Sequence, residues 1–323
     1  MRTLQNQNRL ASSLISLLNS SLVAVVLVLL IIAFATMAPD FISSNNILTL
    51  LQSVAVIAIL AIGQTFVIIT AGIDLSQGAV IGLTGILGAG VMGNNVGSII
   101  LGVAIALAVG ALVGLVNGLL TAYTKVPAFI VTLGTLSIAS GSALLITGGQ
   151  PIYQLPKGFD SFGTSALGVF PYIIIVSVVL AIIGQILLGR TRFGRSVYAI
   201  GSNRRASILS GLAVRRNIVL VYVMSGLFSA VGGMLLTAYV NSALPTAGQN
   251  YELDSIAAVV IGGGSLFGGQ GTVWASMLGV LLIGVLANGT DLIGLSNYAQ
   301  TVILGCVVIG AVYVDSFRKR VAV

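Results

Sequence analysis

Three acidic side chains lie where chemistry could take place. Asp74 stands in the segment TAGIDLS (70–76), inside a long stretch without lysine or arginine. Glu252 and Asp254 stand together in the segment YELD (251–254). Paired carboxylates can serve as acid and base in a hydrolase. A single carboxylate in an apolar stretch is typical of a transport pathway or of a helix cap.

The residues that most enzymes use are missing. The chain has no histidine and one cysteine, Cys306, in an apolar run (302–314). Without histidine, the serine–histidine–aspartate and cysteine–histidine nucleophile arrangements and the usual zinc sites are excluded. No loop of the form G-x-x-x-x-G-K-[ST] is present, so ATP is not bound in that way. We therefore expect no catalytic residue, no metal and no cofactor on this chain, and a hydrolase built on Glu252 and Asp254 is the weakest alternative.

The composition indicates that membrane helices position these residues. Hydrophobic residues make up 57% of the 323 residues and charged residues 7%, against roughly 25% charged in ordinary globular domains. The mean hydropathy is +1.12. Glycine is abundant, at 41 residues, and small residues allow membrane helices to approach closely. We therefore expect an all-α polytopic membrane protein.

Hydropathy gives the number of segments, since a crossing needs about 20 apolar residues. We expect about ten transmembrane segments, some of them broken or re-entrant. They lie near 21–38, 47–70, 77–93, 99–122, 127–147, 171–189, 218–240, 254–266, 272–290 and 297–314. The eighth is too short for a full crossing, so eight or nine spans are also open.

The basic residues set the orientation. Lysine and arginine occur only at 2, 9, 125, 157, 190–216 and 318–320, and short basic loops stay in the cytoplasm. This places both termini and the loop 190–217 in the cytoplasm. We expect a cytoplasmic segment at 1–20, a transmembrane domain at 21–315 and a cytoplasmic tail at 316–323. The first apolar stretch also resembles a signal peptide, but the parity of the spans favours a retained helix.

Two glycine-rich breaks interrupt the apolar pattern, at 67–78 and 259–271. In each, an apolar run rich in β-branched residues is interrupted by glycines, and the chain then continues as a helix. Such pairs of interrupted segments often lie near the pathway of transporters built from repeats. Asp74 in the first break either lines that pathway or, with Ser76, caps a helix that starts at Gln77. Both roles are compatible. The second break is expected to be irregular backbone that is buried or lines a cavity.

Polar side chains within the spans suggest an uncharged polar substrate, although each one alone is more typical of a hydrogen bond between helices. The candidates for the translocation pathway are Gln64, Asp74, Ser76, Asn117, Asn241, Glu252, Asp254 and Asn288. Glu252 and Asp254 are expected at the external mouth, where a solvated loop end or a helix cap is the alternative.

The loop 190–217 carries seven of the fourteen basic residues. Ser202 or Asn203 can cap a short helix and Gly211 can end it. A capped, partly apolar helix favours docking of a protein over simple contact with anionic lipids. No continuous basic face with aromatic residues is present, so a nucleic-acid partner is not expected. The candidate docking residues are Asn203, Arg204, Arg205, Ala206, Ser207, Ile208, Leu209 and Gly211.

Five segments together resemble the permease subunits of bacterial ABC sugar importers. They are TAGIDLSQGAVIGLTG (70–85), VPAFIVTLGTL (126–136), TRFGRSVYAIGSNRRASILSGL (191–212), SGLFSAVGGMLL (225–236) and PTAGQNYELDSIAAVVIGGGSLFGGQGT (245–272). The family is the ribose/xylose/arabinose/galactoside group, which shares a superfamily with branched-chain amino-acid permeases. The likeness is greatest to the members that transport ribose, and it runs from about residue 40 to Asp315.

The resemblance implies a half-pore in the bacterial inner membrane that works as a dimer, expected to be a homodimer. ATP and Mg²⁺ would be bound by a separate ABC ATPase subunit, and a periplasmic sugar-binding protein would deliver the substrate. The segment Asn203–Gly211 matches the coupling helix that sits in a cleft of the ATPase. Transport would follow alternating access, with a branched-chain amino acid as the alternative substrate. A stand-alone secondary transporter or channel would carry ionisable residues in its spans for ion coupling, and only Asp74 clearly qualifies.

Overall fold

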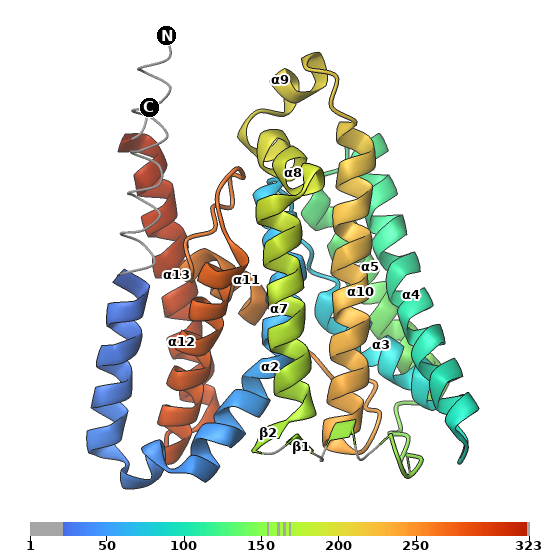
Figure 1. Ribbon diagram of the computed structural model, residues 1–323, viewed down its shortest axis with the longest axis vertical. Coiled ribbons are helices and arrows are strands. Elements are labelled where there is room, and N and C mark those ends of the chain that lie inside the picture. Colours follow the sequence, from blue (N-terminus) through green and yellow to red (C-terminus); the bar gives the residue numbers. More distant parts are fainter. Residues whose placement is uncertain (1–21, 154, 160–161, 164–165, 168, 322–323) are drawn as a thin grey trace.

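The computed structural model describes residues 22–321, except 154, 160–161, 164–165 and 168. The described part is a bundle of helices whose long axes run mostly along the longest dimension of the molecule (Figure 1). The short helices α8 and α9 lie at one end, called here the α9 end, and the β1–β2 hairpin lies at the other, called the hairpin end (Figure 1). The cytoplasmic segment expected at 1–20 lies outside the described residues.

The chain opens with a helix over Leu22–Met37 and a 3-10 turn, η1 (Pro39–Ile42). The helices that follow are α2 (Ser44–Ile69), α3 (Gln77–Ala89), α4 (Val96–Tyr123), α5 (Ala128–Thr147), α7 (Tyr172–Arg190), α8 (Arg192–Ser202), α9 (Arg204–Leu209), α10 (Val214–Val240), α11 (Tyr251–Ile261), α12 (Val273–Leu292) and α13 (Asn297–Val321). Strands β1 (Ala166–Leu167) and β2 (Phe170–Pro171) pair antiparallel.

Every segment expected to be helical contains a helix, and the polytopic all-helical prediction is confirmed. In the described part, six helices are long and apolar enough to cross a membrane, namely α2, α4, α5, α7, α10 and α12. The helix 22–37, α3 and part of α13 are apolar but shorter, and α11 has 11 residues. Length and composition alone therefore support fewer crossings than ten.

Several helix boundaries differ from the expectation, most clearly those of α10, α11 and α13. Helix α10 begins at Val214 rather than 218, and α13 continues to Val321 rather than ending at 314. Hydropathy finds only the apolar part of a helix, and no glycine or proline lies between 311 and 321 to end α13. Helix α11 spans Tyr251–Ile261 rather than 254–266 because three glycines follow it, of which Gly263 has a φ of 98°.

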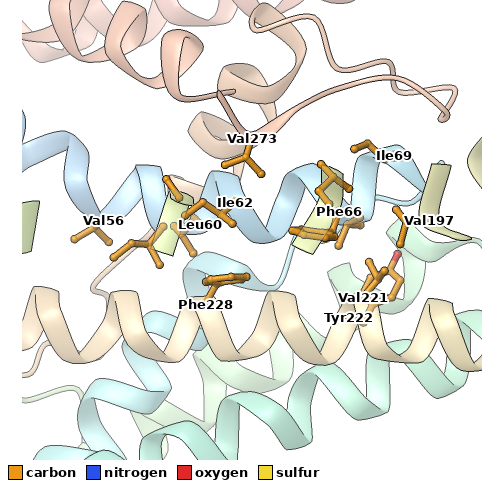
Figure 2. Close-up of a cluster of buried hydrophobic side chains, with 14 of the residues drawn as sticks. Val56, Leu60, Ile62, Phe66, Ile69, Val197, Val221, Tyr222, Phe228 and Val273 are labelled. Atoms are coloured by element: carbon orange, nitrogen blue, oxygen red, sulfur yellow. The ribbon is translucent and has the colours of Figure 1, made fainter. Parts of the chain in front are cut away.

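The core is organised around α2. Figure 2 shows Leu60 and Phe66 of α2 between Val273 at the start of α12 and Phe228 of α10. Helices α2 and α10 approach closely because of a small residue, since a Cβ at Gly63 would lie 3.0 Å from the Ser225 Cα. Helices α4 and α10 approach each other closely for the same reason, since glycines of the two helices face each other. The abundant glycine is thus explained by backbone approach between helices.

Two spans are broken, as the glycine-rich segments predicted. Residues 70–76 are non-helical between α2 and α3, and residues 262–272 are non-helical between α11 and α12. The breaks meet at the α9 end, where the Gly269 N–H donates a hydrogen bond to the Ile69 carbonyl oxygen (2.9 Å). Helix α3 runs from its break toward the hairpin end, whereas α11 runs antiparallel to α12 toward the α9 end (Figure 1). The two half-helices therefore start at similar depth and point in opposite directions.

Candidate functional site

Asp74 is the centre of a buried polar network. Only 1% of its surface is exposed, and its carboxylate accepts hydrogen bonds from Ser76 and Ser225. The Ser76 backbone N–H (3.0 Å) and hydroxyl (2.6 Å) donate to Oδ1, and the Ser225 hydroxyl (2.6 Å) donates to Oδ2. Asp74 thus faces protein rather than lipid, as the cost of a carboxylate in hydrocarbon requires. It does not cap α3 directly, because its backbone donor is the residue before that helix.

Amide side chains extend the network on both sides of Asp74. The Asn117 Nδ2 on α4 donates to the Ser76 hydroxyl (2.9 Å), and the Asn117 Oδ1 accepts from Thr135 on α5 (2.6 Å). On the other side, the Gln77 Nε2 donates to the Ser225 hydroxyl (2.9 Å), while its Oε1 accepts from Ser255 on α11 (2.9 Å). The network therefore joins the first break to α3, α4, α5, α10 and α11.

The direction of these hydrogen bonds is consistent throughout. Each serine hydroxyl next to Asp74 accepts from an amide and donates its own proton to the carboxylate. Both oxygens of the carboxylate accept in this arrangement, because the Ser76 N–H and the two serine hydroxyls are donors. The start of α3 is therefore held by neutral side chains from four neighbouring helices and by one acidic acceptor.

Glu252 lies inside the protein, so the alternative of a solvated loop end is wrong for this residue. It is 8% exposed. Its carboxylate lies against Gly78 in the first turn of α3, where any Cβ would overlap it and the Gly248 carbonyl oxygen. The segment 241–250 enters the protein beside α3, since a Cβ at Gly82 would lie 2.7 Å from the Pro245 oxygen. This re-entrant path carries the first turn of α11 to the depth of the Asp74 network.

Three of the remaining candidates lie apart from this network. Gln64 is fully buried in α2, and neither atom of its side-chain amide has a hydrogen-bond partner among the described residues. Asn241 is exposed and ends α10 in the left-handed conformation, at a φ of 53°. Asn288 on α12 exchanges two hydrogen bonds with Asn46 near the start of α2. The last of these is an interhelical contact, which was the alternative interpretation.

Asp254 faces a cavity. The cavity has a volume of about 310 Å³ and lies between α2, α11, α12 and α13. Its walls also carry Ser53, Tyr251, Thr290 and Gln300. The structure therefore separates the two neighbouring acids, with Glu252 against α3 and Asp254 in the cavity.

The loop 190–217 forms two helices, of which α9 is the short helix expected. The Asn203 Oδ1 caps it by accepting from the Ala206 N–H (2.9 Å), and Gly211 follows it with a φ of 77°. Ile208 and Leu209 are 57% and 88% exposed at the end of the molecule, with Arg204 also exposed beside them. Exposed apolar side chains thus lie beside basic ones on α9, which lies at the tip of the molecule (Figure 1).

Helix α8 connects α9 to both breaks. A Cβ at Gly201 would overlap the Ile69 carbonyl oxygen at the end of α2 and would lie 2.5 Å from the Gly269 nitrogen. The Tyr198 hydroxyl donates to the Gly271 carbonyl oxygen (2.6 Å). Burial raises the pKa of Tyr198 to about 12, so this donor keeps its proton. Helix α8 thus contacts both breaks, through backbone atoms at Gly201 and through the Tyr198 hydroxyl.

Sequence reasoning missed several residues that connect these parts. Ser225, Gln77 and Ser255 complete the Asp74 network, and Gly201 and Tyr198 of α8 touch the breaks. Ser225 and Ser255 lie 151 or more residues from Asp74 in the sequence. Their place in the same network could not be predicted from sequence spacing. A glycine between Ile200 and Ser202 in a polar loop was the one available signal for the close approach of α8.

Comparisons with known proteins show which family and which relatives this chain resembles. A family described as "Branched-chain amino acid transport system / permease component" matches residues 46–312. The ribose import permease protein RbsC of Bacillus subtilis (strain 168) is 43% identical over 298 residues, which are 92% of this chain and 92% of that protein. RbsC of Escherichia coli (strain K12) is 39% identical over 299 residues, covering 91% and 93% of the two chains.

A third relative transports a different sugar. The galactose/methyl galactoside import permease protein MglC of Escherichia coli (strain K12) is 37% identical over 324 residues, covering 95% of this chain and 96% of that protein. No solved structure matches the chain. The match covers the Asp74 break, α8, α9 and both half-helices, and the chain therefore belongs to the family of bacterial transport-system permease components that includes these import permeases.

Proposed function

We propose that this chain is the membrane permease subunit of an ABC importer that carries a monosaccharide, ribose or a related pentose or hexose, across the bacterial inner membrane. The observation that carries the proposal is identity of 37–43% over 91–95% of this chain to permeases for ribose and for galactosides. The protein transports rather than catalyses. The neutral hydroxyl and amide groups of the Asp74 network support an uncharged, hydroxyl-rich substrate.

The α9 end faces the cytoplasm in this proposal. Helix α9 and its arginines lie there, and basic loops stay inside. The helix 22–37 runs toward the hairpin end, and α13 runs toward the α9 end and ends there (Figure 1), which supports cytoplasmic termini. The two broken spans cross as a half-helix plus an extended segment, and on this count ten segments cross the membrane.

An ABC ATPase subunit docks on α9 and holds the ATP and Mg²⁺. The exposed Ile208 and Leu209 fill a cleft of that partner, and Arg204 and Arg205 lie beside them. Closure of two ATPase subunits moves α9, and α8 carries the movement to both breaks. The substrate path then opens alternately to the two sides. Asp74, Ser76, Asn117 and Glu252 hold the half-helices whose displacement opens and closes it.

Two further partners complete the importer. A periplasmic binding protein delivers the sugar to the hairpin end, so that this chain need not bind its substrate tightly. A second permease copy, taken to be identical, supplies the other half of the pore. The exposed apolar residues of α5 and α13 provide surface for that copy and for lipid.

The docking of the ATPase is tested by charge placed on α9. In Leu209→Glu, a carboxylate on a residue that is 88% exposed removes apolar contact without disturbing the interior of this chain. We expect the ATPase to be lost from the purified complex and sugar uptake to fall to background. Leu167→Glu, on the β1–β2 hairpin at the opposite end, is the matched control for retention of the ATPase, because Leu167 is also exposed, at 68%. Retention of the ATPase and of full uptake in Leu209→Glu would contradict the proposal.

The substrate is tested by uptake into cells that express the permease with its ATPase and binding protein. The panel contains ribose, arabinose, xylose, galactose and leucine. We expect uptake of one or more sugars and none of leucine. Uptake of leucine alone would assign the chain to the amino-acid branch that its family is named for.

A further inference from the structure

We propose that the cavity between α2, α11, α12 and α13 is a sugar-binding site on the outward half of the transport path, with the Asp254 carboxylate as its principal acceptor. The inference rests on the proposed function and adds the place where this chain itself contacts its substrate. The cavity measures about 310 Å³, and ligand cavities of small molecules begin at roughly 300 Å³.

The depth of the cavity fits a path that opens at the hairpin end. Helix α12 begins next to the hydrogen bond between Tyr198 of α8 and Gly271. The residues of α12 that line the cavity lie in the other half of this helix, away from α8. Its inner wall is formed by Tyr251 and Asp254 in the first turn of α11. The neighbouring side chains in that turn, Glu252 and Ser255, reach the start of α3. The cavity thus ends where the two half-helices meet.

The Asp254 carboxylate is without a partner in the described part of the chain, because no hydrogen bond or ion pair reaches it. A carboxylate that faces lipid costs several kcal/mol, so the cavity must hold water or a polar ligand. Asp254 is also largely withdrawn from solvent, which strengthens any hydrogen bond it accepts. Two neighbouring hydroxyls of a sugar supply the pair of donors that such an acceptor requires.

The other polar groups of the cavity fit the same ligand class. Ser53 and Thr290 offer hydroxyl oxygens as acceptors, because their protons are donated to backbone carbonyls of their own helices. The Gln300 Nε2 donates to Asp291 and to the Leu295 carbonyl oxygen. Tyr251 offers a ring with a hydroxyl, and aromatic side chains pack against apolar faces while their polar end binds. No basic side chain is among the described residues that line the cavity. A neutral polyol is therefore favoured over an anion or an amino-acid zwitterion.

A second cavity at the hairpin end provides a contrast. It has a volume of about 360 Å³ and lies between α3, α5 and the segment after α5. Its described lining is apolar except for Thr147 and Gln150 and includes no charged residue. Its volume also suffices for a sugar, but it lacks a strong acceptor. The two cavities therefore differ in the chemistry of their walls and not in size.

The test uses thiol labelling, because Cys306 is the only cysteine of the chain. In a Cys306→Ser parent, single cysteines replace Ala287 or Ser53, which are exposed and line the cavity from α12 and α2. Thr147→Cys places a thiol in the second cavity as the matched control. The complete transporter, in right-side-out vesicles, is treated with a membrane-impermeant maleimide with or without ribose, galactose or leucine.

We expect both cavity thiols to react from outside and to be protected by the transported sugar. At a sugar concentration about ten times the dissociation constant, labelling should slow about tenfold, because only empty sites react. The Thr147→Cys control should react equally fast with and without sugar, and leucine should protect none of the three. Unchanged labelling of both cavity thiols in sugar, or no labelling of either, would overturn the proposal.

Asp254→Asn added to each cavity variant tests the acceptor. Loss of a charge-assisted hydrogen bond should raise the half-protecting sugar concentration by roughly tenfold or more. Asp40→Asn, which changes an exposed carboxylate in η1, should leave that concentration unchanged. An Asp254→Asn variant with unaltered protection would also refute the assignment. Ribose uptake by the Cys306→Ser parent checks the proposed function separately, so that uptake without protection rejects only the cavity.

Discussion

Replacing Gly201 with alanine tests whether α8 transmits movement to the two breaks. The new Cβ would overlap the Ile69 carbonyl oxygen and lie 2.5 Å from the Gly269 nitrogen. Both neighbours are backbone atoms, so no side-chain rotation can relieve the overlap. The two breaks must instead separate from α8 by roughly 1 Å, and overpacking of this kind costs about 1–3 kcal/mol.

The same substitution would otherwise favour the helix, since alanine is preferred over glycine in α-helices by about 1 kcal/mol. A loss of uptake in Gly201→Ala would therefore result from the overlap with the two breaks and not from a change in helix propensity. Because the strain acts on the packed conformation, we expect it to shift the conformational equilibrium of the permease. A cost of about 1–3 kcal/mol corresponds to a change of about 5- to 150-fold in population or rate.

The assay compares ATP-driven sugar uptake with ATP hydrolysis by the reconstituted importer. We expect Gly201→Ala to reduce uptake by about tenfold or more while ATP hydrolysis falls less, since the ATPase still docks on α9. Gly189→Ala is the matched control, because its Cβ would meet only the Gln185 side chain, at 3.6 Å. Normal uptake by Gly201→Ala at normal abundance would refute the role of α8.

Three further substitutions test the network and the loop. Asp74→Ala leaves three donors of Ser76 and Ser225 without their acceptor and should lower the free energy of unfolding in detergent by about 3 kcal/mol; a change below that of Ser225→Ala would contradict this. Tyr198→Phe removes the hydrogen bond to Gly271 and should reduce stability by about 1 kcal/mol, measured by thermal unfolding, with a matching fall in coupled uptake. Asn203→Ala removes the cap of α9 and should cost about 1 kcal/mol of local helix stability, seen as faster amide exchange in α9 and weaker retention of the ATPase.

The helices were predictable because each one satisfies its backbone internally and is long enough to be visible as apolar sequence. The position of α9 was also predictable, since Asn203 and Gly211 are local signals at its two ends. The ends of α10 and α13 were not, because their terminal turns carry charged residues outside the apolar stretch. Local sequence thus gives an element and its caps but underestimates helices that extend beyond the hydrocarbon.

The site was predictable only in part, because its contacts join distant segments. Asp74 stood out as a carboxylate in an uncharged stretch, but its partner Ser225 is one of many serines. Glu252 and Asp254 are two residues apart and take opposite environments, since successive polar positions in one helical turn face different neighbours. Their separation could be read only from the packing of α11 between α3 and α12.

The contacts that hold the breaks differ between the α9 end and mid-depth, and this difference suits alternating access. At the α9 end, Gly201 meets backbone atoms of both breaks, and Gly269 is bonded to Ile69. Such contacts have no rotamers to absorb displacement, so we expect them to pass a movement of α8 on to both breaks. At mid-depth, the half-helices are held by neutral hydroxyls and amides around Asp74, and such groups can exchange one partner for another or for water at small net cost. If α8 displaces the two breaks, we therefore expect the hydrogen bonds of the Asp74 network to rearrange and accommodate the displacement. This network lies next to the cavity in which we propose that Asp254 binds the sugar.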